Sequence, residues 1–150
     1  MADFLLVPTS ELGIEGDLRA SGNAYLQTDG LETAIRLSLF TDRRALEGDD
    51  LPEGTGAFGE DLRGYWADVF SSTGPMGSRL WTLKRSALTN ETRQRARDFS
   101  LEALDWLIAV GIASEINIET EVAAGGLLKI GIEVVREADT PARYAYLWRL

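Results

Sequence analysis

The last third of the chain alternates apolar and polar residues with a regularity that leaves few choices of fold. Residues 116–122 and 128–134 place apolar side chains, or in one case Thr120, at every second position, and residues 143–150 repeat the pattern with aromatic residues. A period of two predicts strands that are buried on one face only. Gly125-Gly126 and Asp139-Thr140-Pro141 supply the turns. We therefore expect a three-stranded antiparallel meander at the C-terminus.

Two amphipathic helices are predicted before these strands. Residues 31–40 repeat apolar side chains at helical spacing, and residues 91–110 form a longer helix that Thr89 or Asn90 caps and Gly111 ends. A shorter helix is expected over residues 78–85. The stripe of the longer helix that we expect to be buried consists of Ala96, Phe99, Ala103, Leu104, Leu107 and Ile108.

The N-terminal segment predicts a hairpin over residues 16–27, after a short apolar run at residues 3–7. Strands, helices and strands in this order indicate an α+β fold, in which two to three helices pack on one face of an antiparallel sheet made of the hairpin and the meander. We expect one domain over residues 1–150, with a long irregular, glycine-rich segment at about 46–77.

Composition removes several classes of function. The chain has no cysteine and no histidine, which excludes disulfides, thiol or Ser-His-Asp catalysis and the usual transition-metal sites. A net charge of −9 argues against binding to nucleic acid. The longest apolar run, residues 106–113, is too short to span a membrane, and the N-terminus does not resemble a signal peptide, so we expect synthesis in the cytoplasm.

Charge is distributed unevenly along the sequence. Residues 47–61 contain six acids and no base, whereas residues 79–97 contain six bases and a single acid. The two segments are either solvated faces or complementary patches that dock against neighbouring subunits in a fixed orientation. Trp66 lies in the irregular segment, where an aromatic side chain can anchor a partner. The candidates for a neighbour interface are Asp49, Asp50, Trp66, Arg79, Arg93 and Arg97.

Motifs that suggest chemistry have simpler explanations. Gly54-Thr55-Gly56-Ala57-Phe58-Gly59 has the letters of a dinucleotide fingerprint but follows an acidic loop instead of a strand. The acids near residue 50 lack the order of an EF-hand. Glu32 and Asp42 could form a glycosidase pair, but ten helical residues separate them by about 15 Å, beyond the roughly 5–9.5 Å that such enzymes use. We predict no catalytic residue, no cofactor and no metal.

Four segments carry a resemblance to a known family. They are residues 29–45 (DGLETAIRLSLFTDRRA), 51–54 (LPEG), 64–68 (GYWAD) and 77–83 (GSRLWTL), which occur in the order and at about the spacing of that family. Together they resemble the small baseplate protein of Mu-like contractile phages. This protein is the counterpart of the sheath-initiator wedge proteins of other contractile tails, whose wider family carries a lysozyme-like label.

The resemblance implies a structural part of a virion and not an enzyme. Such a subunit would be assembled in the host cytoplasm and would lie in a six-fold ring of the tail baseplate. It would contact baseplate wedge proteins and the tail sheath protein, with tail tube or hub proteins as further candidates. It would nucleate sheath assembly by adding a strand to a sheath subunit.

A C-terminal strand with free backbone groups on one side is a template for pairing with another chain. The candidate residues for the sheath interface are Arg143, Tyr144, Tyr146, Trp148, Arg149 and Leu150, with the strand at 128–134 beside them. The alternative is that this strand is an interior member of the sheet. Two other functions stay open from sequence: a peptidoglycan-cleaving, lysozyme-like enzyme that uses Glu32 and a second acid, and a stand-alone peptide- or strand-binding module.

Overall fold

The computed structural model describes residues 30–52, 61–71, 74–137 and 140–150 in full, together with the backbone of six short N-terminal strands. The strands pair antiparallel, β1 with β6, β2 with β3 and β4 with β5. Their bounds are β1 Ala2–Phe4, β2 Leu6–Pro8, β3 Gly16–Leu18, β4 Ala20–Ser21, β5 Ala24–Tyr25 and β6 Gln27–Asp29. In the predicted hairpin, Ala20 pairs with Tyr25 and Ser21 with Ala24.

The C-terminal meander is present as predicted. Strands β7 (Glu115–Ala123), β8 (Leu127–Val135) and β9 (Ala142–Arg149) form an antiparallel sheet with β8 in the centre. The first turn is a short 3-10 segment, η3 (Ala124–Gly126), in which Gly125 has a φ of 76°. On β8 every second side chain is buried, from Leu128 to Val134, as the alternation predicts.

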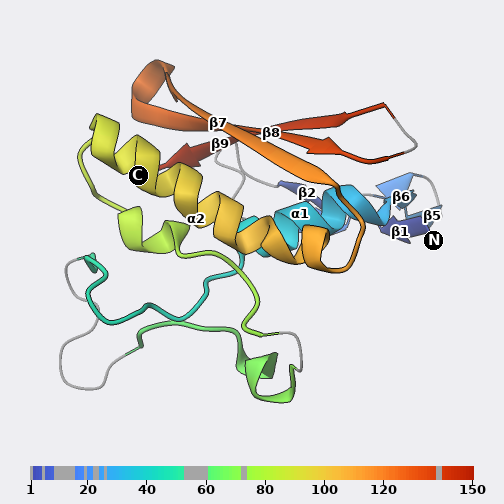
Figure 1. The fold of residues 1–150 in the computed structure, drawn as a ribbon, viewed down its shortest axis with the longest axis horizontal. Coiled ribbons are helices and arrows are strands. Elements are labelled where there is room, and N and C mark those ends of the chain that lie inside the picture. The colour runs from blue at the N-terminus through green and yellow to red at the C-terminus, as the bar shows by residue number, and fades with distance from the viewer. Residues whose placement is uncertain are drawn as a thin grey trace.

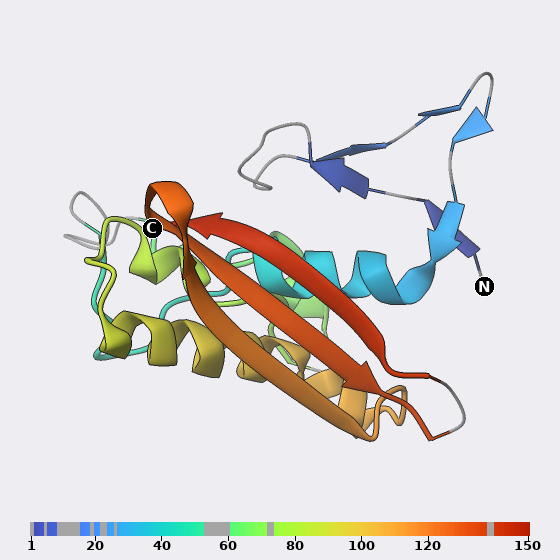
Figure 2. The same ribbon diagram turned by 90° about the horizontal axis from the view of Figure 1, so that it is seen from above.

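Two α-helices, α1 (Gly30–Phe40) and α2 (Asn90–Ala109), lie on one face of this sheet (Figure 1). Seen from above, α2 runs beneath the β7 side and α1 beneath the β9 side (Figure 2). The Thr89 side chain accepts a hydrogen bond from the Thr92 N–H and so caps α2, and Gly111 follows the helix with a φ of 76°. The predicted fold class, α+β, is confirmed, but the predicted hairpin (β4 and β5) forms a two-stranded sheet of its own and does not join the meander.

The prediction that Ile108 belongs to the buried stripe of α2 is wrong, because its side chain is 43% exposed. Thr92 and Ser100 are buried on this stripe instead. The Ser100 hydroxyl donates to the Ala96 carbonyl, which lets a polar side chain occupy the core. The buried stripe of α2 therefore runs from Thr92 to Leu107, and it begins and ends earlier in the helix than the hydrophobic pattern suggests.

The described parts of the connection between α1 and α2 lie on the side of the helices away from the sheet (Figure 1). This connection contains two 3-10 helices, η1 (Trp66–Phe70) and η2 (Leu80–Leu83), and all four residues of η2 are buried. The Arg43 N–H donates to the Ser78 carbonyl and the Ser78 N–H to the Thr41 carbonyl, and these bonds tie the connection to the end of α1. Gly77 permits this approach, since its φ is +99° and a Cβ there would lie 2.3 Å from the Thr41 oxygen.

Within the described ranges, no helix combines the length and the apolar character needed to cross a bilayer.

Candidate interaction site

The two edge strands of the sheet differ in what covers their backbone. On β7, the Ile118 carbonyl accepts a hydrogen bond from Arg97 Nε at 3.0 Å, and the Thr120 carbonyl accepts one from Arg93 Nη2 at 3.0 Å. Both arginines belong to α2. In return, the Thr120 hydroxyl donates to the Arg93 carbonyl at 3.2 Å. Two consecutive outward carbonyls in the middle of β7 are therefore occupied by side chains of the same chain.

The register shows which backbone groups face outward on the opposite edge. Successive residues of an antiparallel strand turn their N–H and C=O alternately toward and away from each neighbour. The carbonyls of Ile118 and Thr120 point away from β8. The backbone of Glu119, which lies between them, therefore bonds to its partner Gly131 on β8. The alternate β8 residues then bond to β9, where Ile130 pairs with Tyr146 and Ile132 with Tyr144.

It follows that four residues of β9 direct their N–H and C=O groups away from the sheet: Arg143, Ala145, Leu147 and Arg149. Among the described strands none pairs with this edge. Within the described part of the chain, β9 is thus an edge strand and not an interior member of its sheet. No hydrogen bond from the described residues reaches its outer edge, whereas two outward carbonyls of β7 are occupied.

The side chains of β9 divide into two sets. Tyr144, Tyr146, Trp148 and Leu150, which were predicted for the sheath interface, turn toward the helices, and Trp148 is only 1% exposed. The Trp148 ring stacks on Phe40 of α1 at 5.5 Å, and Phe40 meets Tyr146 edge-on at 5.4 Å. Burial raises the pKa of Tyr146 to about 12. These side chains hold the strand in place; Trp148 is buried, whereas Tyr144, Tyr146 and Leu150 are half-buried.

The outward side chains of β9 are exposed. Arg143 donates to Glu133 of β8 at 2.8 Å, and Arg149 lies on the surface. Ala145 and Leu147, which sequence reasoning missed, share this exposed face, and Leu147 is 40% exposed. The alternation itself could have identified them, because a core-facing aromatic set leaves the intervening residues outside.

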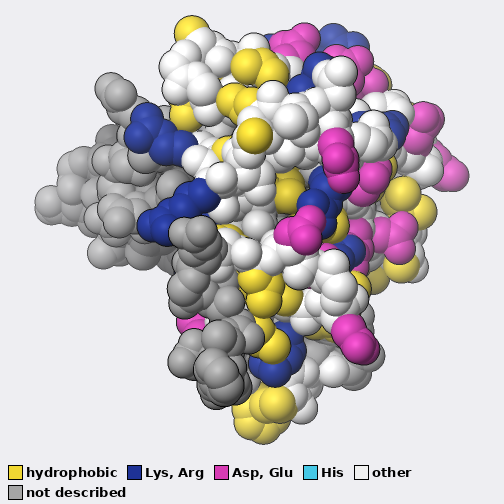
Figure 3. Space-filling view, turned by 90° about the vertical axis from the view of Figure 1, so that its left-hand side faces the viewer, with side chains coloured by type: hydrophobic (Ala, Val, Ile, Leu, Met, Phe, Trp, Pro, Cys, Tyr) yellow, Lys and Arg dark blue, Asp and Glu magenta, His cyan; other side chains and the backbone are white. Residues whose placement is uncertain are grey.

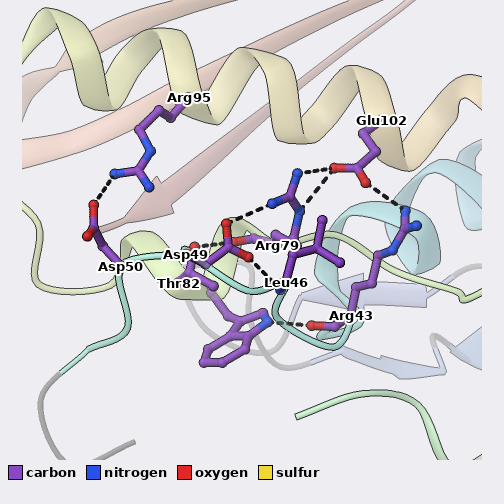
Figure 4. Close-up of polar contacts among 9 residues, drawn as sticks. Arg43, Leu46, Asp49, Asp50, Arg79, Thr82, Arg95 and Glu102 are labelled. Carbon is purple, nitrogen blue, oxygen red and sulfur yellow. Dashed lines mark hydrogen bonds and ion pairs between the residues drawn. The ribbon is translucent and has the colours of Figure 1, made fainter. Parts of the chain in front are cut away.

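The acidic and basic segments predicted as docking patches meet each other within the chain (Figure 4). Arg79 donates to Asp49 at 2.7 Å and to Glu102 of α2 at 2.7 and 3.1 Å, and Glu102 also contacts Arg43 at 3.2 Å. The Asp49 carboxylate accepts from the Leu46 N–H as well. This network, which we call the Arg79 cluster (Arg79, Asp49, Glu102 and Arg43), ties the start of the irregular segment to α2.

Arg79 is well suited to this central position. Its guanidinium lies 4.4 Å from the centre of the Phe99 ring, a cation–π contact. Burial alone would lower the pKa of Arg79, but the hydrogen bonds to Glu102 and Asp49 outweigh it and raise the pKa above its ordinary value. On part of one face of the molecule, acidic and basic side chains lie beside one another (Figure 3).

The remaining neighbour-interface candidates have different surroundings. Asp50 pairs with Arg95 at 2.7 Å, and the Asp50 side chain is 83% exposed. Arg93 and Arg97 bind β7, as described above. Trp66 is 75% exposed. Asp50, Trp66 and Arg97 are exposed, and of these Arg97 is bound to the backbone of β7.

Trp66 belongs to an exposed apolar knob on η1, formed with Val69 and Phe70, which are 82% and 81% exposed. Asp68 fixes this helix, because its carboxylate accepts from the Tyr65 N–H at 3.3 Å and from the Met76 N–H at 2.9 Å. Figure 1 shows η1 extending from the body of the molecule on the side opposite the sheet. A fixed, protruding apolar knob is suited to insertion into a partner.

The carboxylates considered for catalysis are held by arginines. Glu32 pairs with Arg36 at 2.8 Å, one helical turn away, and Asp42 pairs with Arg63. Within the described ranges no group of acids is arranged to hold a metal ion. The glycine-rich motif at residues 54–59 lies outside the described residues. The described geometry therefore contains no observation that favours a peptidoglycan-cleaving site.

Comparison with known proteins gives consistent results. The sequence model of a family described as phage protein GP46 matches residues 31–141, which include α2, β7, β8 and all of α1 except its first residue. The chain is 41% identical to the baseplate protein gp46 of Escherichia phage Mu over 132 residues, which are 88% of this chain and 86% of that protein. It is 33% identical to the Mu-like prophage FluMu protein gp46 of Haemophilus influenzae over 121 residues, 81% of this chain and 79% of that one.

Proposed function

Because the chain belongs to the phage protein GP46 family, it is a structural protein of a phage baseplate, and we propose that it connects the baseplate to the tail sheath. In this proposal it occupies a six-fold ring of a contractile tail in the virion. It is held there by wedge proteins and by tube or hub proteins. It nucleates the first sheath ring by strand addition and performs no catalysis.

The open edge of β9 is the observation that carries this proposal. Four residues, Arg143, Ala145, Leu147 and Arg149, offer outward N–H and C=O groups along one edge. An extended segment of a sheath subunit that pairs there would gain affinity from main-chain hydrogen bonds. Alternate side chains on the exposed face, such as Leu147, would add specificity.

The edge is also prepared for binding before a partner arrives. Trp148 and Tyr146 fix β9 on Phe40 and the core, so the strand is already ordered. A preordered edge avoids the entropic cost of ordering the receiving strand at the moment of association. We therefore assign the aromatic residues to positioning the strand and the outward backbone to binding the sheath.

The wedge contact is proposed at the opposite side of the molecule. The knob of Trp66, Val69 and Phe70 lies beyond the helices, away from the sheet (Figure 1). Asp50 is exposed near the Arg79 cluster and adds a charge that can set the orientation. Two separate surfaces would allow one subunit to bind a wedge neighbour and the sheath at the same time.

The test is co-purification of the tagged chain with the sheath and wedge proteins encoded with it. Ala145→Pro removes one outward N–H from the edge of β9 without removing a bond to β8. The matched control Ala145→Val keeps that N–H and tolerates the strand conformation. We expect Ala145→Pro to lose the sheath protein and keep the wedge protein, whereas Ala145→Val keeps both.

Retention of the sheath protein by folded Ala145→Pro would place the interface elsewhere. The enzymatic alternative is tested by Glu32→Gln, which should leave the assembly of particles unchanged if the chain is purely structural. A stand-alone strand-binding module would bind extended peptides through β9 but would not enter tail particles.

A further inference from the structure

The covering of β7 by α2 involves two arginines at successive turns of the helix. Arg93 and Arg97 reach the Thr120 and Ile118 carbonyls, two consecutive outward positions of the strand. Arg93 is additionally fixed by Asn90, whose side-chain oxygen accepts from Nη1 at 3.2 Å. A guanidinium on a carbonyl is a charge-assisted hydrogen bond and is among the stronger ones available to an edge.

Covering one edge matters because a sheet with two open edges can pair with itself. β7 and β9 have nine and eight residues, so the outer edge of β9 in one copy matches the outer edge of β7 in another. Such a β9-to-β7 contact is heterologous, and unless rotation closes it, it repeats into a filament. Open edges of this kind are the usual route to self-association in β proteins.

We infer that Arg93 and Arg97 are specificity-determining residues that make strand addition one-sided by closing β7 against a second copy of this chain. This inference rests on the proposed function in one respect, namely that β9 is an acceptor edge. Its consequence is that β7 of a second copy cannot complete the sheet at β9.

The inference also explains the placement of charge on α2. Arg95 lies between the two blocking residues but on another side of the helix, where it pairs with the exposed Asp50. Residues 93 and 97 are four apart and so share one face, the face toward β7. The basic segment therefore contains two kinds of arginine, one pairing with the acidic loop and one closing a strand edge.

The experiment compares self-association of three purified full-length variants by sedimentation velocity over a hundredfold range of concentration. The double variant Arg93→Met/Arg97→Met keeps the aliphatic stems and removes the donors. Arg95→Met is the matched control on the same helix. The triple variant adds Ala145→Pro to the double variant and so closes the other edge.

We expect the weight-average mass of the double variant to rise with concentration to at least twice that of a monomer. Arg95→Met should behave as the unmodified chain, and Ala145→Pro should return the double variant to that behaviour. Circular dichroism confirms folding in each case. If the double variant does not fold, Arg97→Met alone replaces it, since Arg97 is exposed and its loss opens only the Ile118 carbonyl.

A folded double variant that associates no more than Arg95→Met overturns the inference, and so does association that Ala145→Pro leaves unchanged. The proposed function fails separately. If Ala145→Pro reverses self-association in the double variant but does not weaken sheath capture by the otherwise unmodified chain, the blocking role stands and the sheath contact lies elsewhere.

Discussion

Replacement of Arg79 by methionine is the perturbation that most directly tests how the irregular segment is held. Arg79→Met keeps an apolar stem over the Phe99 ring and removes the guanidinium from the Arg79 cluster. Asp49 then keeps only the Leu46 N–H among its described partners, while Glu102 keeps Arg43. The matched control is Arg95→Met, which breaks the exposed pair with Asp50.

The expected magnitude follows from exposure. The Asp49 side chain is 8% exposed and that of Arg79 is 15% exposed, so removing the arginine leaves a nearly buried carboxylate. Breaking a buried ion pair in this way costs about 3–5 kcal/mol. The Glu102 side chain is 32% exposed, so the loss of the Arg79–Glu102 ion pair resembles the loss of a surface pair. Such a loss costs about 0–1 kcal/mol. Because Asp49 keeps its bond from the Leu46 N–H, the cost lies at the lower end of this range, and we expect Arg79→Met to lower the free energy of unfolding by about 3–4 kcal/mol. Arg95→Met should lower it by less than about 1 kcal/mol.

Urea denaturation followed by tryptophan fluorescence and circular dichroism measures both values. Adding Asp49→Asn to Arg79→Met should recover part of the loss, because the amide carries no buried charge. A thermal scan should show Arg79→Met melting roughly 6–16 °C lower. Equal destabilisation by Arg79→Met and Arg95→Met would refute the argument, since it would mean that the cluster behaves as a solvated surface.

Three further outcomes are expected. Gly77→Ala should lower the free energy of unfolding by more than about 2 kcal/mol, because its Cβ would meet the Thr41 carbonyl. Gly74 also has a positive φ but has open space around it, so Gly74→Ala should lower that free energy less in urea denaturation. Trp66→Ala should leave the melting temperature nearly unchanged and abolish wedge binding in co-purification. Between pH 10 and about 12 the Tyr146 hydroxyl ionises in the unfolded chain but stays neutral in the native state. The free energy of unfolding should therefore fall as the pH rises through this range, and Tyr146→Phe should lessen that fall.

Much of the fold could be predicted from local pattern. Period-two alternation predicted the meander and the core face of β8, because one-sided burial selects that pattern directly. Thr89 and Gly111 marked the ends of α2 through capping chemistry. The exposure of Ile108 was not predicted, since hydrophobic spacing alone does not show where the helix stops contacting the sheet.

The candidate site was less accessible to sequence reasoning, because it depends on contacts between distant residues. Arg97 reaches Ile118 and Arg79 reaches Asp49, and neither contact has a local signature. The charge runs therefore suggested docking patches, although the acids and bases partly neutralise each other within the chain. The edge position of the last strand was anticipated, but its aromatic residues were assigned to a partner and instead pack on the core.

The most direct measurement is hydrogen exchange of single backbone amides in β9, with and without the sheath protein bound. In the free chain the outward amides of Arg143, Ala145 and Leu147 should exchange rapidly, and those of Tyr144 and Tyr146, bonded to β8, slowly. Sheath binding should slow the outward set by at least tenfold and leave β7 unchanged. Protection that appears elsewhere while these three amides still exchange at the free rate would contradict strand addition at β9.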